Sequence, residues 1–94
     1  MLTLNMLVNM LQRIVKECRY KFGETYLEGI KEHKSKFVVF MNIGGRRVKV
    51  IVNKNDVKVR VFSGLTGMDI SLRRIFAREY EKELRLKKLG EKSL

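Results

Sequence analysis

Basic residues that alternate with apolar ones in the middle of the chain have the types and the spacing needed to bind phosphate groups. Four of them form two pairs with a spacing of two residues: Arg47 and Lys49, and Lys58 and Arg60. Residues two apart in a β-strand point to the same side of a sheet, so each pair would present two cations together. Phe40, in the preceding apolar run, could add an aromatic ring on which a nucleobase stacks. These residues predict a nucleic-acid-binding face.

A second basic cluster stands in a helix-forming segment near the C-terminus and consists of Arg73, Arg74 and Arg78. Arg74 and Arg78 are four residues apart, so they would share one face of the helix. Asp69 or Ser71 could cap the start of that helix. Because a helix N-terminus presents unpaired N–H groups, we expect this cluster to form a second phosphate site.

Catalytic and metal-binding motifs are missing from the sequence. It has no glycine-rich phosphate loop with its lysine, no His-Glu-x-x-His motif and no pair of cysteines for zinc, so no metal or cofactor is expected. His33, the only histidine, is expected in an exposed loop, although it could serve as a general acid or base for RNA cleavage. Glu79, Glu81 and Glu83 are expected to be solvated partners of basic residues on the same helix. The sequence therefore favours a binding protein over an enzyme.

The element that must position the basic residues is a β-meander over residues 36–62. Gly44-Gly45 separates the first two alternating runs and predicts a two-residue hairpin loop, which places Phe40 opposite Lys49. The apolar residues of all three runs then share one face: Phe37, Val39, Met41, Val48, Val50, Val52, Val57, Val59 and Val61. A register shift of one residue would bury the charges, so the register should be strongly specified.

A second tight loop is expected at Lys54-Asn55. It would place Lys49 opposite Arg60. Arg47 would then lie opposite Phe62, so that a ring and a cation are again neighbours. The outer face would also carry four apolar side chains: Val38, Phe40, Ile51 and Phe62. This pattern is compatible with an open face and with a face covered by another element or a second subunit.

Helical periodicity flanks the meander on both sides. Residues 2–21 repeat apolar side chains at three- and four-residue steps, and residues 70–89 do the same before a tail at 90–94. A second apolar set in the first helix widens its stripe: Leu2, Met6 and Met10. This wide stripe is either part of the core or a self-association surface.

Residues 24–35 could form a short helix or a strand over residues 25–31. Gly29 is unfavourable inside a helix and favours the strand, which would place Tyr26, Glu28 and Ile30 on one side. The expected fold class is α+β, with a three- or four-stranded antiparallel β-meander and an N-terminal and a C-terminal helix packed on one face. The order of elements would be α-(β)-β-β-β-α.

Composition limits the function further. The 94 residues should form one domain, and 21 basic against 10 acidic residues give a net charge of +11. Residues 36–67 hold seven basic residues and one acidic, so over half of the excess lies on the meander and its flanks. This favours polyanionic partners such as nucleic acid, although a Lys-, Arg- and Glu-rich, proline-free chain is also typical of a thermophilic source.

Cysteine usage and the N-terminal sequence bear on location. Cys18 is the only cysteine, so no intrachain disulfide can form, which is expected in the reducing cytoplasm. The apolar N-terminus lacks the basic leader of a signal peptide and the length of a membrane span, so we expect it to belong to the fold and no membrane partner.

The order of elements resembles that of the double-stranded-RNA-binding domain and of the HicA-type toxin ribonucleases, which share that fold. The resemblance rests on His33 ahead of the first hairpin, on Gly44-Gly45-Arg46-Arg47-Val48 in its turn, and on Ser71-Leu72-Arg73-Arg74-Ile75-Phe76 opening the last helix. The glycine-rich Lys-Lys stretch of the first family and the Gly-Ser-His of the second are missing, and residues 57–62 add a strand. The resemblance is therefore an analogy of topology.

These observations lead to one principal expectation and two alternatives. The principal one is a small protein that binds DNA or RNA mainly through the phosphate backbone, with little base-specific readout. The first alternative is a protein-interaction or homodimerisation module that self-associates through the N-terminal helix or the outer sheet face. The second is a small ribonuclease built around His33.

Overall fold

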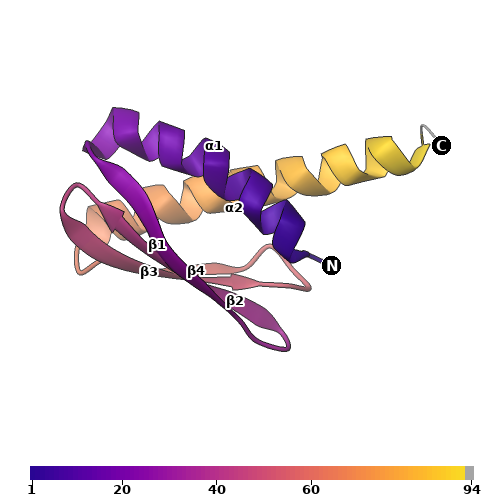
Figure 1. Cartoon of the computed structure of the whole chain (residues 1–94), viewed down its shortest axis with the longest axis horizontal. Helices are drawn as coiled ribbons and strands as arrows, with labels where there is room; N and C mark the ends of the chain where they lie inside the picture. The colour runs from indigo at the N-terminus through magenta and orange to yellow at the C-terminus, as the bar shows by residue number, and fades with distance from the viewer. Residues whose placement is uncertain (93–94) are drawn as a thin grey trace.

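The computed structural model describes the backbone of residues 1–92 and the side chains of residues 1–90. In this part of the chain one antiparallel sheet has two helices on one of its faces, α1 (Leu4–Phe22) and α2 (Thr66–Lys92) (Figure 1). The strands between them are β1 (Thr25–Glu32), β2 (Lys36–Ile43), β3 (Arg46–Asn53) and β4 (Val59–Phe62). They are neighbours in chain order, so the sheet is a meander with β1 and β4 at its edges. The predicted α+β class is confirmed, and residues 24–35, for which the sequence allowed a helix or a strand, contain the strand β1.

The core lies between the helices and the sheet. α1 packs over β1 and β2, α2 packs over β4, and the two helices contact each other. Phe37, Phe76 and Tyr80 are buried at its centre. Cys18 is also fully buried, and this burial raises the pKa of its thiol to about 11. Within the described residues, no helix has the length and apolar character required to span a membrane.

α1 starts later than predicted because Thr3 caps it. The Thr3 hydroxyl oxygen accepts a hydrogen bond from the Met6 N–H at 3.2 Å. The helix ends at Gly23, whose φ is 94° and whose N–H donates to the Arg19 carbonyl at 3.2 Å. Met6 and Met10 are buried in the core. The wide methionine-rich stripe is therefore core, and it offers no exposed surface for self-association.

The hairpin between β2 and β3 has the predicted two-residue loop and the predicted register throughout. Gly44 and Gly45 have φ values of 61° and 83°, as both loop residues of a type I′ turn require. The loop rests against the end of α1, where the Gly44 N–H donates to the Glu24 carbonyl at 2.7 Å. A Cβ on Gly44 would lie 2.7 Å from the carbonyl oxygen of Phe22. Glycine is thus required here by conformation and by space.

The hairpin between β3 and β4 differs from the prediction by two residues. Its loop is longer because the Asn53 N–H donates to the Lys58 carbonyl at 3.1 Å and closes the loop there. Two side chains stabilise the longer loop as Asx turns: Asn53 accepts from the Asn55 N–H at 2.9 Å, and Asp56 accepts from the Lys58 N–H at 3.1 Å. Lys58 and Val57 therefore lie outside β4.

This shift changes the residue pairs but not the faces. Lys49 pairs with Phe62 and not with Arg60, which pairs with Ile51. The predicted pair of Arg47 and Phe62 is wrong for the same reason. Because a shift by two residues leaves each side chain on its own side, the valines of β3 and β4 still face the core.

β1 carries a β-bulge at Glu28, which the alternation pattern did not reveal. Gly29 pairs with Phe40, and Glu28 has no partner on β2 because the register shifts there. Tyr26 lies on the outer side of the sheet, whereas Ile30 packs against the core. The prediction that these residues share one side with Glu28 is therefore wrong.

α2 is longer than the predicted helix at both ends. It begins at Thr66 and continues through Gly90 into the predicted tail, of which residues 93–94 lie outside the described residues. Asp69 does not cap it, because this carboxylate accepts hydrogen bonds from the Ser63 N–H at 2.8 Å and the Ser63 hydroxyl at 2.5 Å. Ser71 lies further along, inside the helix. Both predicted caps are therefore wrong, and Asp69 instead ties the end of β4 to the first turn of α2.

Candidate nucleic-acid interface

The outer face of the sheet, meaning the side opposite the helices, brings together Phe40 and three of the cations predicted to bind phosphates, Arg47, Lys49 and Arg60. One row across the four strands consists of Gly29, Phe40, Lys49 and Phe62. The neighbouring row consists of Lys31, Val38, Ile51 and Arg60. Arg47 stands next to the first row, two residues from Lys49 on β3. Both helices lie on the other side, and no described segment crosses this face (Figure 1).

Cations lie against both aromatic rings of these rows. Lys49 Nζ is 5.0 Å from the centroid of the Phe62 ring, and Lys31 Nζ is 6.0 Å from that of Phe40. Both distances are within the range of cation–π attraction. Phe62 is 48% exposed and Phe40 is partly exposed, so a nucleobase could reach either ring.

The four apolar side chains of the outer face do not form a continuous bare patch. Val38 is only 9% exposed. It lies between Lys31 and Ile51 in its row, and Ile51 lies next to Arg60, so the stems of two cations flank the aliphatic pair. A lysine separates the two rings in the other row. This arrangement favours an open, charged surface over one covered by a second subunit.

The cations of the outer face have no carboxylate partner among the residues that the structure describes: Lys31, Lys36, Arg47, Lys49 and Arg60. Lys36, Lys58 and Arg60 line a hollow of about 260 Å³. Lys58 is thus still close to the outer face, although it belongs to the loop. No ion pair with a described residue engages these cations, so their charge remains available to a polyanion.

A larger hollow, of about 630 Å³, opens on the outer face. The residues that line it include two aromatic, two basic and one acidic residue: Glu28, Gly29, Phe40, Arg47, Lys49 and Phe62. Its volume lies within the range of small-ligand sites, about 300–1,000 Å³. A base could stack here while the phosphates on either side contact arginine or lysine.

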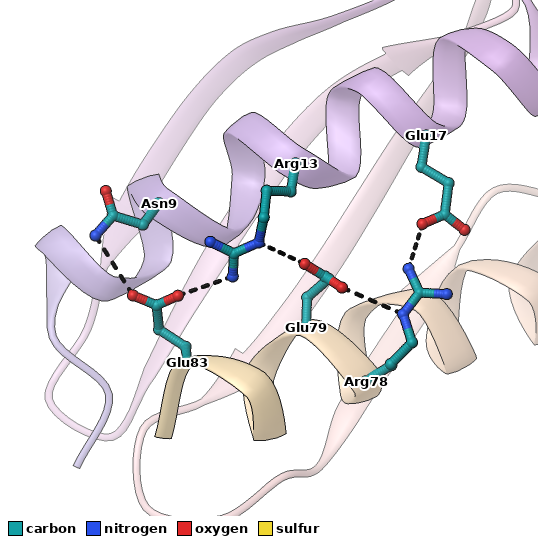
Figure 2. Close-up of polar contacts among 6 residues, drawn as sticks. All are labelled: Asn9, Arg13, Glu17, Arg78, Glu79 and Glu83. Carbon is teal, nitrogen blue, oxygen red and sulfur yellow. Dashed lines mark hydrogen bonds and ion pairs between the residues drawn. The ribbon is translucent and has the colours of Figure 1, made fainter. Parts of the chain in front are cut away.

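The second predicted phosphate site is divided in the structure. Arg78 is already engaged, because its guanidinium pairs with Glu17 and its Nε donates to Glu79 at 3.2 Å (Figure 2). Arg73 and Arg74 are exposed and have no carboxylate partner in the described part of the chain. They lie about two turns into α2, whereas the unpaired N–H groups of a helix are in its first turn.

Ion pairs join α1 to α2. Arg13 contacts Glu79 at 2.6 Å and Glu83 at 2.8 Å, and the Asn9 amide donates to Glu83 at 3.4 Å (Figure 2). The Glu79 and Glu83 side chains are only 7% and 8% exposed. The expectation that Glu79 and Glu83 are solvated is therefore wrong, and both pair with Arg13 of the other helix, although Glu79 also pairs with Arg78 of its own helix. Asn9 and Arg13, two polar residues four apart on an apolar helix, are the sequence signal for this contact.

The arginines keep the carboxyl groups of Glu79 and Glu17 ionised. Burial acts to raise the pKa of Glu79, but hydrogen bonds from Arg13 and Arg78 outweigh it and lower the pKa below its usual 4.5. The hydrogen bond from Arg78 likewise lowers the pKa of Glu17. The lowered pKa values keep Glu79 and Glu17 in the form that pairs with the arginines, so these two carboxylates stabilise the helix pair and are not suited to donate a proton near neutral pH.

His33 lies in the turn between β1 and β2, where its backbone N–H donates to the Lys36 carbonyl at 2.8 Å. Its imidazole is exposed and makes no hydrogen bond or ion pair with a described residue. The described residues also contain no group of three His, Cys, Asp or Glu side chains that could hold a metal ion. The structure thus places no orienting partner beside this histidine.

An apolar hollow of about 420 Å³ lies between α1 and β1. Its apolar lining comes from Val8, Leu11, Val15, Tyr26 and Leu27. Lys16 and Arg19 also border it. Because β1 is an edge strand, the hollow is next to backbone groups that no other strand pairs.

Comparisons with known proteins identify no relative: no family model, no curated protein and no solved structure matches this chain. By its fold and its candidate interface, the protein is an α-β-β-β-β-α domain whose outer sheet face carries cations and aromatic rings.

Proposed function

We propose that this protein binds nucleic acid through the outer face of its sheet, mainly by contacts to the phosphate backbone. The observation that carries the proposal is the row of Phe40, Lys49 and Phe62, flanked by Arg47 and Arg60, on a face that no described segment covers. Cations neutralise phosphates and release counterions, while exposed rings provide stacking surfaces that tolerate any base.

The distribution of acidic residues supports this proposal. Glu17, Glu79 and Glu83 are paired within the helix layer, and Glu32 pairs with Lys54 at 2.7 Å. Asp56 and Asp69 accept hydrogen bonds in loops. Six of the ten acidic residues are therefore engaged in ion pairs or loop hydrogen bonds, whereas the outer face holds five cations without a described carboxylate partner. The buried, single Cys18 supports action in a reducing compartment such as the cytoplasm.

The homodimer alternative has support from the apolar hollow beside the free edge of β1. A chain that is dimeric at micromolar concentration and has no affinity for nucleic acid would favour this alternative. The ribonuclease alternative has less support, because His33 has no partner in the described residues. Loss of RNA cleavage in His33→Ala with binding intact would favour it.

The test is a binding assay with fluorescent single-stranded and duplex DNA and RNA. The variant Lys49→Glu/Arg60→Glu reverses two charges on the outer face. A control with the same change in net charge is Lys87→Glu/Lys88→Glu, at exposed positions of α2. We expect the first variant to lose at least about tenfold in affinity, because two phosphate contacts become repulsions, and the control to lose much less. Equal affinities of the two variants would rule out the outer face as the binding surface.

A further inference from the structure

The larger hollow of the outer face has a feature that phosphate binding does not use, a carboxylate among cations. Among the described residues that line this hollow, Glu28 is the acidic one. It is exposed and has no ion-pair partner in the described residues. A carboxylate here lowers the affinity for phosphate, so its position needs another explanation.

The backbone of β1 also departs from a regular strand at this place. The bulge leaves Glu28 without a partner on β2 and places Gly29 opposite Phe40. A Cβ built on Gly29 would meet no atom within 4 Å, so open space lies beside the ring of Phe40. Glycine within a strand often marks a point where a ligand approaches the backbone closely, and bulges redirect side chains at binding sites.

From the ring, the open space and the carboxylate, which rest on the proposed function, we infer that the hollow binds an unpaired guanine of a single strand. The base stacks on Phe40 in the space that Gly29 leaves. Glu28 accepts hydrogen bonds from the base edge. An ionised carboxylate accepts only, and guanine is the base whose Watson–Crick edge presents two adjacent donors, N1–H and the N2 amino group. Lys49 and Arg47 contact the flanking phosphates.

This inference departs from the expectation of little base-specific readout. It also selects single strands over duplexes, because the Watson–Crick edge of a paired guanine is not accessible. The ribose 2′-hydroxyl plays no part in it, so single-stranded RNA and DNA share the chemistry, and both are tested.

The experiment compares short oligouridine with the same strand carrying one central guanine, or one central inosine, which lacks the N2 amino group. DNA versions show whether the sugar matters. The wild type should bind the guanine strand about tenfold more tightly than oligouridine, with inosine in between. Glu28→Ala should lose this difference and bind oligouridine at least as tightly as the wild type, because a negative charge has been removed. Glu81→Ala, which removes an exposed charge from α2, should keep the preference.

A second variant tests the stacking space independently. Gly29→Val fills the space beside Phe40 and suits a strand, so the unfolding midpoint should stay the same or rise. Affinity for the guanine strand should fall about tenfold. An equal gain of affinity for every strand in Glu28→Ala would show that this carboxylate only repels phosphate, and it would overturn the inference while leaving the proposed function intact. A guanine preference that survives Gly29→Val would overturn it too. Absence of binding to all strands would overturn both proposals.

Discussion

Position 44 requires glycine for two independent reasons. Its φ of 61° disfavours any other residue, and a Cβ would lie 2.7 Å from a backbone oxygen of Phe22. We expect Gly44→Ala to lower the free energy of unfolding by about 3 kcal/mol, through backbone strain and this clash together. Urea unfolding measures the change.

Gly45→Ala is the control for this substitution. Gly45 has a φ of 83°, but an added Cβ would meet nothing within 4 Å. It should therefore show the backbone strain alone, about 1 kcal/mol. If the two variants lost equal stability, the close approach of Gly44 to the Phe22 carbonyl would add no cost beyond backbone strain.

At the residue scale, alternation predicted the side of the sheet for most of the candidate interface. Phe40 and Lys49 are paired as predicted, because a one-residue slip would have buried charge. Glu28 was missed as a site residue. A bulge adds a residue without a distinctive sequence pattern, so the alternation on its two sides gave no signal that Tyr26 and Ile30 face opposite ways.

At the scale of the elements, the contact between α1 and α2 depends on Arg13. It pairs with two carboxylates that are less than one-tenth exposed. Arg13→Ala should lower the free energy of unfolding by about 2 kcal/mol near pH 7, because both carboxylates would be left nearly buried with fewer partners. Arg74→Ala, at an exposed position of α2, should change it by less than about 0.5 kcal/mol.

The same variant predicts a pH effect with a defined sign. In the wild type the pKa of Glu79 is lowered, so its contribution is present above the unfolded-state pKa and is lost as the pH falls through the folded-state pKa. Without the hydrogen bond from Arg13, burial has a larger effect on the pKa of Glu79. Protonation of Glu79 then relieves the cost of keeping its charge nearly buried. The stability difference between wild type and Arg13→Ala should therefore shrink in urea titrations as the pH is lowered toward and below about 4.5. A difference that stays constant would show that Arg13 acts by packing alone.

The wrong prediction of the loop between β3 and β4 also concerns the scale of the elements. The sequence suggested a two-residue loop at Lys54-Asn55, because local turn propensity is all that a hairpin pattern contains. In the fold, the Tyr80 hydroxyl donates to the carbonyls of Asn53 and Lys54 at 2.8 and 3.0 Å, and the Leu2 N–H donates to Lys54 at 2.8 Å. Contacts from α2 and from the residues before α1 hold the longer loop, and no local sequence pattern contains them.

At the scale of the whole molecule, the two faces of the sheet differ in how their charges are paired. The helix layer contains paired carboxylates and arginines, whereas the outer face of the sheet holds cations without described partners. With four or five phosphate contacts, the logarithm of the binding constant should fall with the logarithm of salt concentration with a slope of about −3 for a single strand. Neutralising Arg47 by Arg47→Gln should make the slope shallower by about 0.7, and Lys87→Gln should leave it unchanged. A slope near zero would show that the net charge of +11 serves another purpose.

Cys18, buried in the core on the opposite side of the sheet, gives this protein an internal reporter of binding. Its thiol is inaccessible and resists ionisation in the folded state, so alkylating reagents can react only when the chain opens. The labelling rate then measures how often the core opens, without any added probe. A ligand that binds only the folded chain makes opening rarer as its occupancy rises. An oligonucleotide on the outer face would therefore slow the alkylation of Cys18 without contacting it.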